Sequence, residues 1–155
     1  PATDGGAAGA SDLAVLPVDS AECEALRAAI SDKLGVELTA STTDFASEIA
    51  HMQGTSCTLS ATGTGQDFGN FVDTAQAIRE IFTAEGWTEN MDYLADGPTG
   101  TLSGYENGFK TAFVDVNWEP SEEANCPTDQ PISACNVEPS QQLFTLTIEV
   151  VQAAS

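Results

Sequence analysis

Basic side chains are almost absent from this sequence. It holds 4 Lys plus Arg residues against 24 Asp plus Glu, which gives a formal net charge of −20 with histidine neutral. A protein that binds nucleic acid neutralises phosphates with clusters of lysine and arginine, and so few basic residues cannot build that surface. We therefore expect no nucleic-acid partner. The acidic surface instead favours a basic protein surface or a calcium-bridged contact.

Long apolar runs are also missing. No segment approaches the roughly 18 to 20 apolar residues that a membrane-spanning helix needs. The chain opens with Pro1-Ala2-Thr3-Asp4 rather than with a basic start followed by an apolar stretch. We therefore expect no transmembrane segment and no intact signal peptide. With 155 residues, of which 41% are hydrophobic, the chain is still long enough to bury a proper core.

Cysteine and histidine are scarce, and their spacing bears on the compartment. The sequence has 4 cysteines without a C-x-x-C motif and a single histidine, His51. A tetrahedral zinc site needs paired Cys or His ligands at close spacing, so disulfide bonds explain the cysteines better. Disulfide bonds persist in oxidising compartments. The sequence therefore predicts an extracytoplasmic protein that is secreted, periplasmic or tethered to a cell surface.

The pairing of the cysteines follows from their expected positions. Cys23 precedes Leu26 by three residues, which places it on the buried stripe of a helix. Cys57 lies on the inward face of an expected strand, whereas Cys126 and Cys135 share one short loop. An inward cysteine on a helix and one on a strand pack together naturally. We therefore predict disulfide bonds between Cys23 and Cys57 and between Cys126 and Cys135.

The first residues differ in composition from the rest of the chain. Residues 1–11 are rich in glycine and alanine and contain no large apolar side chain, which indicates a flexible leader or tether. This composition resembles the segment that follows the lipid-bearing cysteine of bacterial lipoproteins, although no cysteine precedes Cys23 here. We expect residues 12–155 to form a single α+β domain.

Two helices are predicted from apolar spacing and capping residues. The first begins at Ser20, whose hydroxyl can cap the helix, and ends at Gly35. The second begins at Asn70 or Asp73 and ends before Gly86. Its apolar positions are Val72, Ala75, Ile78 and Phe82.

Alternating apolar and polar residues predict strands over 43–50, 55–62, 101–105, 109–118 and 143–151. The first two are joined by a turn at Gln53-Gly54, and the third and fourth by an Asn-Gly turn that tolerates positive φ. The more uniform inward face of the fourth strand is Ala112, Val114, Val116 and Trp118.

These elements predict an α+β fold with two helices packed on one face of a four- to five-stranded antiparallel sheet. Helix, glycine stop, turn and strand occur twice in the sequence, with Gly35 and Gly86 as the paired stops. A weak internal duplication is one explanation of this pattern. The other is that two helices over an antiparallel sheet are a common arrangement that needs no shared ancestry.

No group of residues singles out a reaction. A catalytic triad would have to use His51, and the sequence has no G-x-S-x-G elbow. The carboxylates offer many pairs, none of which is distinguished as a hydrolase dyad. Residues 92–97 lack the spacing of an EF-hand loop, and residues 63–69 lack the lysine of a phosphate-binding loop. We therefore predict no catalytic residue and no cofactor, and the sequence leaves metal binding open.

Three aromatic residues fall in or beside turns, outside the predicted core faces: Trp87, Tyr93 and Tyr105. Such rings supply contact area at low entropic cost, and neighbouring carboxylates steer a cation-rich partner toward them. The acidic neighbours are Glu89, Asp92, Asp96 and Glu106. Together these seven residues form the predicted partner-binding set. The alternative is that the rings close the ends of the core.

The sequence thus predicts a monomeric, non-enzymatic extracytoplasmic module that binds a ligand or another protein, either free or tethered to a surface. Two alternatives come from other functional classes. One is a secreted hydrolase that uses acidic residues, for which a deep cleft with two close carboxylates would be the sign. The other is a calcium-dependent structural component of a surface.

Overall fold

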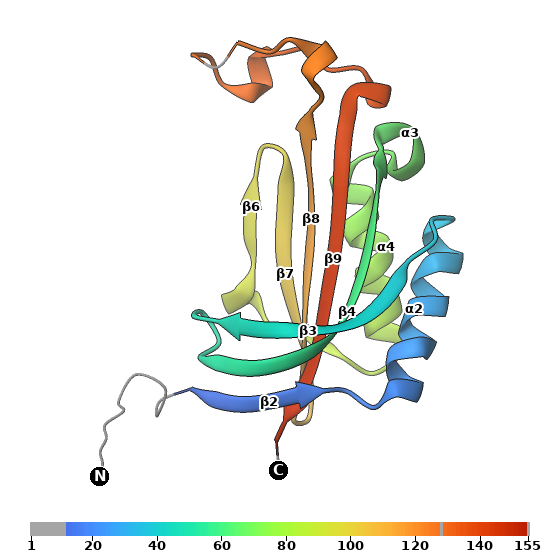
Figure 1. The fold of residues 1–155 in the computed structure, drawn as a ribbon, viewed down its shortest axis with the longest axis vertical. Coiled ribbons are helices and arrows are strands. Elements are labelled where there is room, and N and C mark those ends of the chain that lie inside the picture. The colour runs from blue at the N-terminus through green and yellow to red at the C-terminus, as the bar shows by residue number, and fades with distance from the viewer. Residues whose placement is uncertain (1–11, 128, 155) are drawn as a thin grey trace.

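Figure 1 shows the computed structural model of the chain, which describes residues 12–127 and 129–154. Two long helices cover one face of a mixed sheet of eight strands. The predicted leader, residues 1–11, lies outside the described residues. The helices are α2 (Ser20–Leu34), the short α3 (Gly65–Phe68) and α4 (Phe71–Ala84). The strands are β2 (Leu13–Pro17), β3 (Thr39–Ser47), β4 (Met52–Thr64), β5 (Thr88–Glu89), β6 (Ala95–Gly97), β7 (Gly100–Asn107), β8 (Lys110–Pro120) and β9 (Gln142–Ala153).

The sheet has more strands than the four to five expected, and it is not purely antiparallel. Its order is β3-β4-β2-β9-β8-β7-β5, with β6 paired to β7 and β4 also paired to β9. The pairing of β2 with β4 is parallel, whereas β2 is antiparallel to β9. The additional strands β2, β5 and β6 have 5, 2 and 3 residues. Segments this short carry too few alternating positions to be recognised in a sequence.

Both predicted helices form, and their glycine stops act as expected. Gly35 adopts a φ of 70° and its N–H donates to the carbonyl of Ser31, which ends α2. The side chain of Asn70 accepts from the backbone N–H of Asp73 at the start of α4. The one difference is that Asp19 rather than Ser20 occupies the N-cap position of α2, and it makes no side-chain capping bond.

The β3–β4 hairpin forms, but its turn lies earlier than Gln53-Gly54. The turn occupies residues 48–51, and Gly54 is paired within β4. The reason is tertiary, because a Cβ at Gly54 would overlap the carbonyl oxygen of Val15 on the adjacent β2. Gly54 therefore permits two strands to approach closely rather than marking a turn. The Asn-Gly turn between β7 and β8 is confirmed, with Gly108 at a φ of 64°.

The sheet buries residues on both of its faces. Ala112, Val114 and Val116 of β8 face the helices, as predicted, and belong to the larger core. Phe113 points to the opposite face, where its ring lies 5.8 Å from that of Phe45. This smaller core also contains Val15, Met52 and Val151. Figure 1 shows the cause, because β3 and the start of β4 bend across the other strands at this end of the sheet.

The predicted disulfide pairing is confirmed. Cys23 on α2 is bonded to Cys57 on β4, and Cys126 is bonded to Cys135 in the loop between β8 and β9. The first bond therefore fastens a helix to the sheet, whereas the second only closes a surface loop. Across the described ranges, no helix has the length and apolar content to cross a membrane.

Candidate functional site

The structure places two of the three predicted contact aromatics in the core. Trp87 is 4% exposed and Tyr105 is 1% exposed. The ring of Tyr105 stacks on Phe82 of α4 at 4.9 Å between centroids, and Trp87 meets the same ring edge-on at 5.2 Å. Both rings close the core beneath α4, which is the alternative that the sequence left open. They are not available to a partner.

Tyr93 lies on the other face of the sheet, at the end of a 3₁₀ turn (Met91–Tyr93). Its half-buried ring packs over Gly104, where a side chain would collide with it, and lies 5.2 Å from Phe113. Burial raises the pKa of Tyr93, and the negative charges of Glu106 and Asp92 raise it further. The sheet therefore separates Tyr93 from Trp87 and Tyr105, and the three rings do not share a surface.

The four predicted acids are also divided between locations. Glu89 pairs with Arg79 of α4, with 3.2 Å between Oε1 and Nε. Asp96 accepts a hydrogen bond from the hydroxyl of Thr101 across the β6–β7 hairpin. Asp92 is exposed, and Glu106 lies near Tyr93. The partner-binding set is thus not one patch, and only Glu89 and Asp96 adjoin the same part of α4 and β7.

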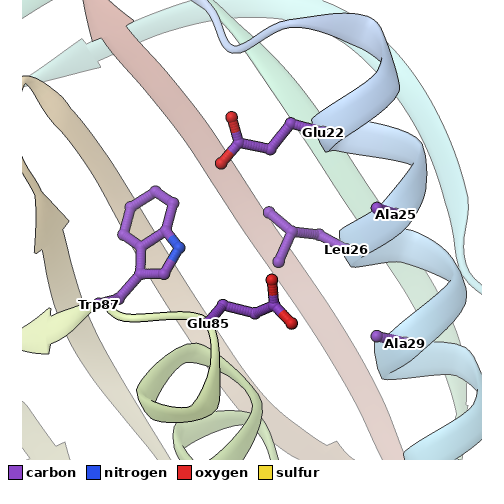
Figure 2. Close-up of a pocket in the computed structure, with 6 residues that line it drawn as sticks. All are labelled: Glu22, Ala25, Leu26, Ala29, Glu85 and Trp87. Carbon is purple, nitrogen blue, oxygen red and sulfur yellow. The ribbon is translucent and has the colours of Figure 1, made fainter.

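A niche between α2 and α4 holds two carboxylates and an indole (Figure 2). Its lining residues are Glu22, Ala25, Leu26, Ala29, Glu85 and Trp87. The volume is about 80 Å³, room for a few water molecules at roughly 30 Å³ each but not for a substrate. Glu22 is already bonded to Nζ of Lys110 at 2.7 Å. This niche gives no support to a hydrolase dyad, because a substrate has no room between the acids.

His51 lies in the exposed turn between β3 and β4, with a positive φ of 55°. A hollow of about 230 Å³ beside it is lined also by Asp12, Ser47 and Glu48. The Ser47 hydroxyl accepts from the backbone N–H of Ala50, which closes the turn. His51 is therefore a residue of the turn, and nothing in its described surroundings assigns it a catalytic role. In the part of the chain that the structure describes, no group of three or more His, Cys, Asp or Glu side chains could hold a metal ion.

An acidic pair lies on the sheet face opposite the helices. Glu149 of β9 is half-buried between Thr58 of β4 and Phe113 of β8 in the strand register. Burial raises the pKa of Glu149, and the nearby charge of Asp115 raises it further. The folded chain therefore holds this proton more tightly than the unfolded chain does, so ionisation of Glu149 opposes folding.

Replacing Glu149 by glutamine should raise the melting temperature near neutral pH. The wild-type chain loses stability as the pH rises from the ordinary pKa of 4.5 through the raised pKa of the folded state, and this loss persists above that window. Glutamine cannot ionise, so the advantage of Glu149→Gln should shrink as the pH falls below 4.5. Thermal melts of both proteins across this range measure the difference.

Glu119→Gln is the matched control, because it removes the same charge from an exposed position on β8. It reports the general relief of repulsion in an acidic chain. A gain for Glu149→Gln no larger than that for Glu119→Gln would contradict the role of burial.

A larger hollow lies between α2 and β3. It has a volume of about 390 Å³ and is lined by Pro17, Val18, Ser20, Cys23, Glu24, Ala40, Ser41, Thr42 and Cys57. The Cys23–Cys57 disulfide is part of its wall. Hydrogen bonds from Arg27 hold the pKa of Glu24 below its ordinary value, so this residue keeps a negative charge at the rim. The hollow therefore combines apolar walls with an ionised Glu24 that is paired with Arg27.

Strand β3 itself is the edge of the sheet. It pairs with β4 over all 9 of its residues, from Thr39 to Ser47, and β4 is its sole partner among the described strands. Helix α2 does not cover its helix-side residues, and Ala40, Thr42, Asp44 and Ala46 are all exposed. Hence β3 offers an accessible backbone edge next to the hollow.

Comparisons of the chain with protein-family models, with curated proteins and with solved structures found no match. What the protein does must therefore be inferred from its own surfaces. Of these, the β3 edge offers both unpaired backbone and an adjoining hollow.

Proposed function

We propose that this protein is a non-enzymatic extracytoplasmic interaction module that takes an extended, basic segment of a partner protein as an additional strand along β3. The observation that carries the proposal is a long, unprotected edge strand beside a hollow of about 390 Å³. In this mode of recognition the main chain gives affinity, and pockets for alternate side chains give specificity.

The edge of β3 is suited to receive a strand. In an antiparallel pair about half of the residues bond to the neighbour, and the other half direct their N–H and C=O groups outward. Proteins protect such edges with lysine, proline or a bulge. Residues 39–47 contain neither lysine nor proline, and their pairing with β4 is continuous. Seven of the nine residues are alanine, serine or threonine, the other two being Asp44 and Phe45, and these small side chains leave the backbone within reach.

The hollow beside β3 would determine which side chains of an added strand are accepted. Alternate side chains of an added strand point to the same face of the sheet, so those on the helix side would lie beside the flank of α2. The apolar walls there come from Pro17, Val18 and the disulfide. Asp44 on β3 and Glu48 in the following turn are exposed, and the net charge is −20. Apolar residues that face the hollow would match its walls, and lysine or arginine at the other positions would match the negative charge of the chain as a whole.

The disulfide bonds support the proposed compartment. Both described bonds are of the kind that persists in secreted, periplasmic or surface-exposed proteins. An acidic module in such a compartment meets partners by diffusion, and its charge accelerates the encounter with a basic segment at low salt.

The proposal is tested with a short synthetic peptide in which lysine and valine alternate. We expect this peptide to bind the protein and a peptide with proline in place of each valine to fail, because proline cannot donate to a ladder. Thr42→Lys should weaken binding roughly tenfold or more, since it places a repelling gatekeeper on the edge. Isothermal titration calorimetry at low and high salt measures the affinity, which should fall as salt rises.

Thr145→Lys is the matched control, because Thr145 is also an exposed strand threonine but lies on the central strand β9. Both variants change the net charge equally, so a purely electrostatic attraction would fall equally in both. Equal weakening by Thr42→Lys and Thr145→Lys, or equal binding of the proline peptide, would overturn the proposal.

A further inference from the structure

The four basic residues of the chain are not equally engaged. Arg27 bonds to Glu24 and Glu37. Lys33 pairs with Glu80 at 3.0 Å, and Lys110 pairs with Glu22 at 2.7 Å. Arg79 differs, because Nη1 bonds to the neutral side chain of Gln76, and Nε lies 3.2 Å from Glu89 without the alignment of a hydrogen bond. The guanidinium of Arg79 thus keeps capacity for an acceptor.

Two of the buried polar atoms without a hydrogen-bond partner belong to the Arg79–Glu89 ion pair. Within the described residues, four buried side-chain atoms lack a hydrogen-bond partner, and three of them are Nε of Arg79, Oε2 of Glu89 and Oγ of Ser103. Glu89 is opposite Tyr105 in the strand register, and Ser103 is two positions from Tyr105 on the same face of β7. These three atoms are enclosed by protein, whereas the Arg79 side chain as a whole is 39% exposed, so a ligand can reach Arg79 only through its exposed part.

A hollow of about 190 Å³ adjoins this cluster, and we name it the Arg79 hollow. It lies between α4 and the β6–β7 hairpin and is lined by Val72, Ala75, Gln76, Arg79, Leu94, Asp96 and Thr101. Val72, Ala75 and Leu94 give it an aliphatic wall. Arg79 and Asp96 place opposite charges on its surface. Arg79 also forms an ion pair with Glu89, which lies outside the lining.

We propose that the Arg79 hollow binds a small zwitterion with an aliphatic body, namely a free aliphatic amino acid. Its carboxylate accepts from the Arg79 guanidinium, its ammonium donates to the Asp96 carboxylate, and its side chain lies against the aliphatic wall. The net charge of −20 selects against a simple carboxylate, which the whole protein repels. A zwitterion has no net charge and escapes that repulsion. This site is separate from the β3 edge.

The test uses the full chain and three probes that share one aliphatic body. L-Leucine carries both charged groups, 4-methylpentanoate lacks the ammonium group, and 3-methylbutylamine lacks the carboxylate. We expect L-leucine to bind at least roughly tenfold more tightly than either analogue, because each analogue leaves one charged wall without a partner. Titration followed by ¹⁵N–¹H correlation spectra measures the affinity and places the shifts on α4, β6 and β7.

Arg79→Gln should weaken L-leucine binding by roughly tenfold or more, through loss of the charge-assisted bond. Lys33→Gln is the control, because it removes one positive charge from another ion pair, that with Glu80 on α4. Val72→Trp is a second variant that fills the hollow from a position 61% exposed, so the fold is retained. It should abolish binding.

Three outcomes would overturn the proposal: no saturable binding of L-leucine, equal binding of all three probes, or equal affinities of the Arg79→Gln and Lys33→Gln proteins. Thr42→Lys should leave L-leucine binding unchanged, so failure at the β3 edge and failure at the Arg79 hollow are distinguishable.

Discussion

Tyr105→Ala should lower the free energy of unfolding by about 3–5 kcal/mol, the range for removing a large aromatic side chain from a core. Tyr105 is 1% exposed and stacks on Phe82 at 4.9 Å, so its removal leaves a cavity between α4 and β7. The cavity is bounded by Phe82 of α4 and by core residues of the sheet, and such surroundings close a cavity only in part. Urea denaturation followed by circular dichroism gives the free energy and the slope that checks two-state behaviour.

Tyr93→Ala provides the comparison, because Tyr93 was predicted, like Tyr105, to lie in or beside a turn but is only half-buried on the opposite face. It should cost clearly less stability. Equal losses for the two variants, or a loss of under about 1 kcal/mol for Tyr105→Ala, would contradict the assignment of Tyr105 to the core.

Removal of the Cys23–Cys57 bond should also destabilise the fold strongly. The two cysteines are 34 residues apart in sequence, and a loop of that length corresponds to about 4 kcal/mol in the chain-entropy model. Both side chains are buried, so the double alanine variant loses packing as well. We expect its urea midpoint to fall far below that of the native protein.

The Cys126–Cys135 bond supplies the internal control. Its partners are 9 residues apart and lie in a surface loop, which corresponds to about 2.5 kcal/mol in the same model. The double alanine variant of this pair should therefore unfold at a higher urea concentration than the Cys23/Cys57 variant. The reverse order would show that the loop, not the helix-to-sheet connection, limits stability.

Several features of the fold follow from local sequence signals. Gly35 and Gly86 both adopt positive φ and lie just beyond the two long helices, because a helix end requires a conformation that glycine adopts without strain. The Asn-Gly turn fixes the β7–β8 hairpin for the same reason. Alternation along β8 correctly assigns Ala112, Val114 and Val116 to the helix side. Each signal acts over a few residues and needs no distant partner.

The cysteine pairing was also predictable, since it needs only an inward helical position for Cys23 and an inward strand position for Cys57. The candidate partner-binding site could be predicted from the sequence only in part. Trp87 and Tyr105 lie next to turns in the sequence, yet the pairing of β5 with β7 brings them under α4 and buries them. Of the predicted partner-binding set, Asp96 lines the Arg79 hollow. Glu89 does not line it but forms an ion pair with Arg79, which does.

By itself the sequence determined the acidic charge, the two disulfide bonds, the two long helices and the alternating faces of the longest strands. Only the tertiary structure decided that β2 enters the sheet beside β4, that Gly54 serves this close approach, and that β3 becomes an exposed edge. The physical reason is that propensity and capping are properties of neighbouring residues. Sheet order, burial and the hollows depend on which distant segments meet, and that is set by the packing of the whole chain.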